Sequence, residues 1–451
     1  MLETDSLKIL RQALERLDAG FQSLPANPED PSDLERVSQV LDETAERLQQ
    51  NYPYFHPLYA GQMLKPPHPV ARLAYALAQC INPNNHALDG GRASSAMEKE
   101  AVAEIARMFG WGKHLGHLTS GGTMANLEAL WIAGQLAPGK TVLASEQAHY
   151  THQRICGVLQ LKFEPVPCDD RARMDMHALK KRVARGDVGT VVATMGTTAT
   201  GSVDPLAEIQ RLRQEYGFRV HCDAAYGGYF VLANNLSPET AKAFARIGDV
   251  DSIVIDPHKH GLQPYGCGCV LFRDPGLGRY YKHDSPYTYF SSKELHLGEI
   301  SLECSRPGAS AVALWATQKL LPLEKSGEFA EGLQNCRAAA VELHERLTAD
   351  KRFLAGFPPD LDIVVFAPMA ASAGGTSALS RQIFDAAAAR QLHLAVAELP
   401  VRFFRSSQGQ MSADEANLTC LRSVLMKPAH RQWLDRIWNL LSEATTEVLR
   451  R

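Results

Sequence analysis

The segment Asp256-Pro257-His258-Lys259 carries the side chain with the clearest chemical potential in this sequence, the amine of Lys259. The apolar run over residues 252–255 that precedes it is typical of a buried strand, which the proline ends because it fixes φ and lacks a backbone donor. Lys259 is therefore expected on a tight turn between two histidines, where an amine loses its proton more readily than a solvated lysine does. A neutral lysine is suited to forming a Schiff base with a carbonyl, although most lysines are solvated surface charges.

Two further stretches place polar or small residues where an apolar run ends, which in open parallel sheets is the edge that binds ligands. Gly121, Gly122 and Thr123 precede a helical pattern, so their backbone N–H groups could receive a phosphate; alone, they would indicate an ordinary N-cap turn. Asp223 directly follows the run over residues 220–222. It is either a capping aspartate or the partner of a protonated ring nitrogen.

Three more residues complete the set that could surround a flat molecule. Thr198 follows another apolar run and offers a hydroxyl group, and the small Ala225 would let a flat ring lie against the backbone. A lone histidine such as His149 is more often a core group, but its imidazole could stack on a planar cofactor. Together these residues describe a site for a flat, anionic, carbonyl-bearing cofactor, and pyridoxal phosphate has that set of groups.

The composition of the chain narrows its class. Its 451 residues include 45% hydrophobic and 22% charged residues with a net charge of -3, which is typical of a soluble globular protein. There is neither a basic excess that favours nucleic acid nor an 18-residue apolar run that favours a membrane. The first residues lack a signal-peptide pattern, and the nine scattered cysteines lack zinc-ligand spacing, so we expect a metal-free protein of the reducing cytoplasm.

Hydrophobic periodicity predicts three parts. Residues 1–65 read as two amphipathic helices and an aromatic, proline-rich stretch, and residues 66–325 alternate strands with helices, which indicates a large α/β domain with a mostly parallel sheet. Residues 326–451 read as a smaller α/β domain that contains a loop at residues 370–375. Ser95 and Glu98 form a capping-box pattern that predicts the start of a helix.

The four cofactor motifs occur in one order that resembles the group II pyridoxal-phosphate-dependent amino-acid decarboxylases, which have fold type I. The resemblance runs from about Tyr52 to the C-terminus, and Pro286-Tyr287 and the segment at residues 305–310 look nearest to the microbial tyrosine/aspartate decarboxylases. One residue departs from the family pattern: His260 stands where tryptophan or another apolar residue is usual. That departure leaves the polarity of the substrate pocket open.

The resemblance implies roles for individual residues. Lys259 would bind the cofactor covalently, His149 would stack on its ring, and Tyr287 would protonate the α-carbon after CO2 leaves, with Tyr289 as the rival donor. The cofactor-binding set that follows from the motifs is Gly121, Gly122, Thr123, His149, Thr198, Asp223, Ala225, His258 and Lys259.

Two residues give information on the substrate, and they favour different substrate classes. Tyr59 lies in an aromatic stretch that could form a flat wall, whereas Arg422 matches an arginine that meets a substrate carboxylate in glutamate-type relatives. We expect an aromatic L-amino acid such as tyrosine; the alternatives are an aspartate or glutamate decarboxylase, another fold type I carbon–carbon lyase, and a catalytically idle binding protein. The resemblance also implies a homodimer with shared active sites.

Overall fold

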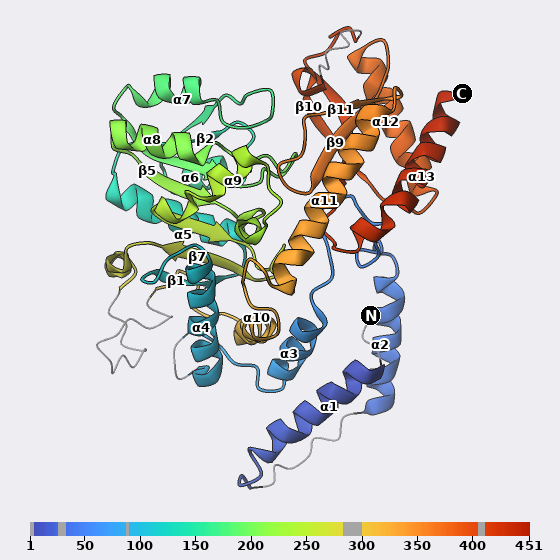
Figure 1. Cartoon of the computed structure of the whole chain (residues 1–451). Helices are drawn as coiled ribbons and strands as arrows, with labels where there is room; N and C mark the ends of the chain where they lie inside the picture. Colours follow the sequence, from blue (N-terminus) through green and yellow to red (C-terminus); the bar gives the residue numbers. More distant parts are fainter. Residues whose placement is uncertain (1–3, 26–32, 87–89, 283–299, 405–410) are drawn as a thin grey trace.

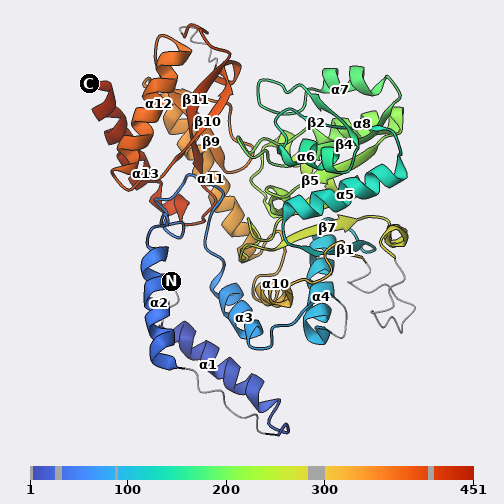
Figure 2. The same ribbon diagram turned by 180° about the vertical axis from the view of Figure 1, so that it is seen from behind.

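A computed structural model describes residues 4–25, 33–86, 90–282, 300–404 and 411–451. Two sheets lie side by side, each with its own helices, and helix α11 runs between them (Figures 1 and 2). The first two helices extend away from both sheets, with α1 beside α3. The predicted α/β class, with a large and a smaller sheet and an N-terminal helical segment, is confirmed, while the domain limits at residues 65 and 325 stay predictions.

The larger sheet has seven strands in the order β1-β7-β6-β5-β4-β2-β3, and β7 runs in the direction opposite to the other six. Most of its strands are buried from end to end, as expected where helices cover both faces of a parallel sheet. The strands are β1 (Leu115–Thr119), β2 (Thr141–Ser145), β3 (Lys162–Val166), β4 (Val188–Thr194), β5 (Arg219–Asp223), β6 (Ser252–Ile255) and β7 (Gly268–Phe272).

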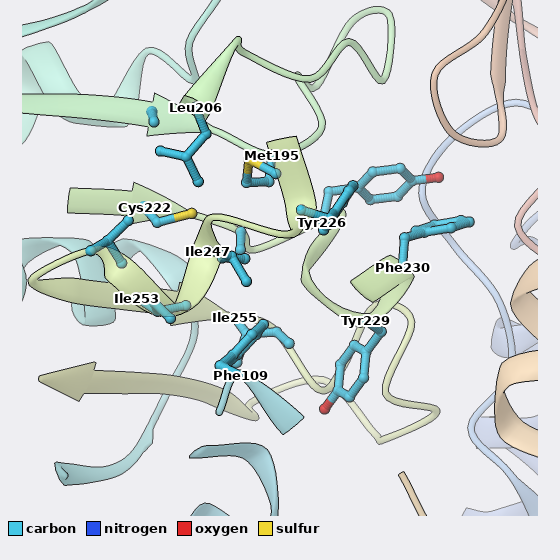
Figure 3. Packing of buried hydrophobic residues seen from close by; sticks show 14 of the residues in the cluster. Phe109, Met195, Leu206, Cys222, Tyr226, Tyr229, Phe230, Ile247, Ile253 and Ile255 are labelled. Atoms are coloured by element: carbon cyan, nitrogen blue, oxygen red, sulfur yellow. The ribbon is translucent and has the colours of Figure 1, made fainter. Parts of the chain in front are cut away.

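Helices on both faces bury this sheet. On one face, side chains of β5 and β6 such as Cys222, Ile253 and Ile255 pack with Phe109 and Phe230 from neighbouring segments (Figure 3). The helical elements are α3 (Pro69–Gln79), α4 (Arg92–Met108), α5 (Gly122–Leu136), α6 (Thr151–Val158), α7 (Met176–Val183), α8 (Leu206–Tyr216), η1 (Gly228–Leu232), α9 (Pro238–Phe244), η2 (Ile247–Asp249), η3 (Pro275–Tyr280) and α10 (Gly308–Leu320).

The smaller sheet is antiparallel, in the order β10-β11-β9-β8. Its elements are α11 (Glu328–Ala349), β8 (Phe353–Ala355), β9 (Ile363–Pro368), α12 (Ala373–Ala388), β10 (Ala395–Pro400), η5 (Val401–Phe404), β11 (Asn417–Val424) and α13 (His430–Leu449). The predicted loop at residues 370–375 is only partly correct. Helix α12 already begins at Ala373, because the Ser372 side chain caps it by accepting from the Gly375 N–H.

The N-terminal helices α1 (Thr4–Ala19) and α2 (Leu34–Leu48) are amphipathic, as predicted, and neither contains a buried residue. Several of their apolar side chains are exposed, with Ile9 and Leu41 more than half exposed, whereas Leu10, Leu14 and Leu17 on α1 are partly buried. None of the helices in the described part of the chain is both long and apolar enough to cross a membrane.

The capping-box prediction at Ser95 is wrong. Helix α4 begins three residues earlier, and both Ser95 and Glu98 are buried within it. Glu98 instead accepts from Asn85, from the backbone of Leu118 and from the Arg306 guanidinium, whose Nη1 lies 2.5 Å from Oε1. This buried ion pair joins α4, the end of β1 and the segment that leads into α10.

We predict that Arg306→Leu destabilises the fold strongly, because Glu98 would be left as a buried carboxylate without its cation. Loss of one partner of a buried pair costs about 3–5 kcal/mol. Urea unfolding should show this loss, and Glu98→Met in the same chain should restore part of it. Arg451→Leu is the control: it removes an exposed pair with Glu447 and should change stability by less than about 0.5 kcal/mol. Equal free energies of unfolding for the Arg306 and Arg451 variants would refute the role of the buried pair.

Candidate active site

A cavity of about 330 Å³ lies where β1, β2, β4, β5 and β6 end, at the carboxyl edge of the larger sheet. That volume is within the range of small-molecule sites. The cavity wall includes every residue of the predicted cofactor-binding set, namely Gly121, Gly122, Thr123, His149, Thr198, Asp223, Ala225, His258 and Lys259. The fold therefore brings together residues that are up to 138 positions apart (259 − 121).

Lys259 lies on the turn after β6, and its Nζ donates to Asp256 Oδ2 at 2.9 Å. This ion pair was not expected, because the sequence suggested two histidines as the neighbours of the amine. Asp256 is buried, and its Oδ1 has no hydrogen-bond partner among the described residues. The His258 ring lies tilted against that of Tyr265, with 4.8 Å between the ring centroids, and burial lowers the pKa of His258 despite the nearby Asp256 carboxylate. The amine thus faces a carboxylate at the cavity wall.

The first turn of α5 forms another wall of the cavity. Gly121 is the N-cap of this helix, no side chain caps it, and no acidic residue lies in the first turn. The backbone N–H groups of such a helix start attract an anion. Position 122 has room only for glycine, because the Cβ of any other residue would lie 2.7 Å from Asp256 Oδ2.

Asp223 ends β5, and both of its carboxylate oxygens receive hydrogen bonds. His152 Nε2 donates to Oδ2 at 2.8 Å, and the Ala225 N–H donates to Oδ1 at 3.2 Å. Burial opposes ionisation of this carboxyl, but the hydrogen bond from His152 and the nearby Lys259 amine outweigh it and hold its pKa well below the usual range. Asp223 is therefore an anion in the cavity wall.

His149 and Thr198 complete the cavity from two loops. His149 Nδ1 accepts from the Thr151 N–H at 3.3 Å, which fixes the ring at the start of α6, and burial lowers the pKa of His149 so that its ring is neutral at pH 7. The turn after β4 begins at Gly196, whose φ of +105° favours glycine. Within that turn the Thr197 hydroxyl is used in a bond with Thr200, so Thr198 is the threonine that faces the cavity.

Two predicted site residues that the structure describes do not line this cavity. Tyr59 is buried in an aromatic cluster, with its ring 4.9 Å from that of Tyr54. Arg422, on β11, donates from Nε to the Ala199 carbonyl and from Nη2 to the Thr198 carbonyl, at 3.0 and 2.7 Å. Tyr287 lies outside the described residues.

His260, the residue that departs from the family pattern, does not line the cavity. The His260 ring is buried at the boundary between the two sheets, with Nε2 3.2 Å from Asp362 Oδ2, and Asp362 also accepts from the Tyr226 hydroxyl at 2.6 Å. Burial opposes ionisation of Asp362, but His260, Tyr226 and Lys65 together hold its pKa below the usual value. The polar residue at position 260 therefore pairs with the smaller domain and does not line the cofactor cavity.

His152 is the functional candidate that sequence reasoning missed. It lies three residues after His149, in the first turn of α6, and this spacing was the only available signal. Its partner Asp223 is 71 positions away, so only the fold shows the pair.

The cavity residues fit pyridoxal phosphate. The α5 N-terminus suits the phosphate, the Lys259 amine suits the aldehyde carbon, and the ionised Asp223 suits a protonated ring nitrogen. The unpaired Asp256 Oδ1 leaves one buried acceptor on the same wall for a donor of a bound molecule.

A family model described as the pyridoxal-dependent decarboxylase conserved domain matches residues 24–368, and the chain therefore belongs to this family of pyridoxal-phosphate-dependent amino-acid decarboxylases. An L-tyrosine decarboxylase of Enterococcus faecium is 28% identical over 440 residues, covering 73% of this chain and 72% of that protein. An L-aspartate decarboxylase of Thermococcus kodakarensis is 30% identical over 312 residues, covering 68% of this chain and 79% of that protein.

The fold is also that of solved structures. A crystal structure of Oryza sativa TDC with PLP and tryptamine superposes with a TM-score of 0.75 at 20% identity, covering 99% of both chains. The predictions of group II membership, fold type I, pyridoxal phosphate as the cofactor and amino-acid decarboxylation as the reaction class are thus confirmed.

We predict that Gly122→Ala weakens pyridoxal phosphate binding at least about ten-fold. The added Cβ would displace the Asp256 carboxylate, and with it the ion pair of Lys259 at the cavity wall. Fluorescence titration of the apoprotein with the cofactor measures this. Gly112→Ala is the matched control, since a Cβ at Gly112 meets nothing within 4 Å. Equal cofactor affinity in the two variants would contradict a functional role for the close approach of Gly122 to the Asp256 carboxylate.

Proposed function

We propose that the protein decarboxylates an aromatic L-amino acid, with tyrosine as the first candidate. The observation that carries the proposal is the set of contacts of Arg422, the one residue that the sequence offered for a substrate carboxylate, as in glutamate-type relatives. Its guanidinium already donates to Gln62 Oε1 and to the carbonyls of Gly61, Thr198 and Ala199. An arginine occupied in this way favours an uncharged side chain over an acidic one.

The described residues suggest how the chain assists this reaction. When bound, pyridoxal phosphate supplies a ring that accepts the electron pair left by the departing CO2. Lys259 would hold the cofactor covalently, and the α5 N-terminus would hold its phosphate. Asp223 would keep the ring nitrogen protonated, while His149 and Ala225 would cover the two faces of the ring.

Protonation of the substrate α-carbon needs a donor, and we propose Tyr287, with Tyr289 as the rival. A phenol can serve as a general acid, and the resemblance to relatives is what favours the first of the two. Both tyrosines lie outside the described residues, so their roles rest on the sequence.

Aspartate is the second candidate substrate. The relative from Thermococcus kodakarensis bears the name L-aspartate decarboxylase and is 30% identical to this chain, which supports an acidic substrate. The occupied guanidinium of Arg422 supports the aromatic one.

A panel of L-amino acids tests the substrate. CO2 release by the purified holoenzyme should give tyrosine a kcat/KM at least about 100-fold above those of aspartate and glutamate. Arg422→Met should change stability but leave the ratio of tyrosine to aspartate unchanged, since the guanidinium is bonded to backbone carbonyls. A preference of the wild-type enzyme for aspartate or glutamate refutes the proposal, and loss of that preference in Arg422→Met would assign it to the guanidinium.

We propose further that the working unit is a homodimer in which α1 and α2 cover the second copy. Both helices carry exposed apolar stripes, as at Val37, Leu41 and Leu48 on α2. A contiguous exposed apolar patch on a protein surface is typical of an interaction site. All nine cysteines lie in the described residues as free thiols, which supports the reducing cytoplasm as the compartment.

The double variant Val37→Glu/Leu41→Glu should therefore shift the protein from dimer to monomer and lower its activity. Light scattering coupled to size-exclusion chromatography measures the mass. Gln39→Glu adds a negative charge on the opposite face of α2 and should remain dimeric. A fully active monomer, in the wild-type chain or in the double variant, would exclude shared active sites.

A further inference from the structure

His152 occupies an unusual place for a buried histidine. It lies in the first turn of α6 with none of its surface exposed, and its Nε2 lies 2.8 Å from Asp223 Oδ2. Because Asp223 is ionised, it can only accept, so the imidazole must carry a proton on Nε2. Its Nδ1 has no hydrogen-bond partner among the described residues, so the contact with Asp223 is the polar bond that holds the ring.

A second buried histidine lies next to it and has a different kind of partner. The His221 ring lies 6.4 Å from that of His152. Its two nitrogens are satisfied by Asn126 Oδ1 at 2.8 Å and Ser252 Oγ at 2.9 Å, and burial lowers its pKa to about 3. His221 is therefore a neutral ring bonded to two uncharged groups, whereas His152 donates to an ionised carboxylate of the cavity wall.

The bond from His152 also fixes the direction of the Asp223 carboxylate. One oxygen receives His152 and the other receives the Ala225 N–H, so the carboxylate plane is held from two sides. Asp223 still lines the cavity, and its remaining lone pairs are available to a group bound there. Removal of one donor from a buried carboxylate makes its ionised form less favourable.

We propose that His152 is a positioning residue that holds Asp223 ionised and directed at the ring nitrogen of the cofactor. This inference rests on the proposed pairing of Asp223 with that nitrogen. His152 itself does not line the cavity, so it acts through the carboxylate. Its loss should weaken the binding of pyridoxal phosphate, but it should not weaken the binding of an analogue that lacks the ring nitrogen.

The test compares two ligands of the apoprotein, pyridoxal phosphate and 1-deazapyridoxal phosphate, which has a C–H group in place of the ring nitrogen. Fluorescence titration gives a dissociation constant for each, and their ratio measures the preference for the nitrogen. His152→Phe removes the donor but keeps a ring of similar size, whereas His152→Gln keeps an N–H donor. His344→Phe, which removes a half-buried imidazole bonded to the Gly356 carbonyl, is the control.

His152→Phe should reduce the preference for pyridoxal phosphate about 10- to 100-fold, the range expected for a hydrogen bond to a charged group. His152→Gln should restore most of the preference, and His344→Phe should leave it unchanged. If His152→Phe weakens both ligands equally, or neither, the residue is only structural and the inference fails.

Asp223→Asn separates this failure from that of the underlying assignment. If Asp223→Asn abolishes the preference for the ring nitrogen while His152→Phe does not, Asp223 keeps its role and only the inference on His152 is refuted. If Asp223→Asn leaves the preference intact, Asp223 does not face the ring nitrogen and both assignments are refuted.

Discussion

The organisation of the site depends on two carboxylates that are buried at the ends of neighbouring strands. Asp223 ends β5 and Asp256 follows β6, and each must be met by donors because a buried charge without partners is costly. Their donors come from different elements: His152 on α6 serves Asp223, and Lys259 on the next turn serves Asp256. These bonds hold the walls of the cavity at fixed positions. The two carboxylates give the cavity the negative charge that suits a cationic ring nitrogen and an amine.

Polar contacts also connect the smaller domain to this edge of the sheet. Arg422 on β11 donates to the carbonyl of Thr198, a residue of the cavity wall. Asp362 accepts from the Tyr226 hydroxyl and lies 3.2 Å from Nε2 of His260, the chain neighbour of Lys259. The guanidinium and the buried carboxylate are satisfied only when the two domains are in contact. The departure from the family pattern at position 260 is thus explained by a contact between domains, and it does not change the polarity of the cofactor cavity.

The sequence predicted most of what lies at strand ends, because an apolar run followed by a polar residue signals the ligand-binding edge of a parallel sheet. Asp223, His149 and Lys259 were found in this way. Contacts between distant segments were not predictable. Glu98 matched a capping box but serves as the buried partner of a residue 208 positions away, and the occupied state of Arg422 depends on loops from the other domain.

A crystal structure of the holoprotein tests the central claim most directly, which is that the carboxyl edge of the larger sheet holds pyridoxal phosphate between the α5 N-terminus and Asp223. The account predicts continuous electron density between Lys259 Nζ and the cofactor. It also predicts the phosphate at the backbone N–H groups of Gly121 and Gly122, and the ring nitrogen within about 3 Å of an Asp223 oxygen. Density joined to another lysine, or a ring nitrogen that faces away from Asp223, would contradict it.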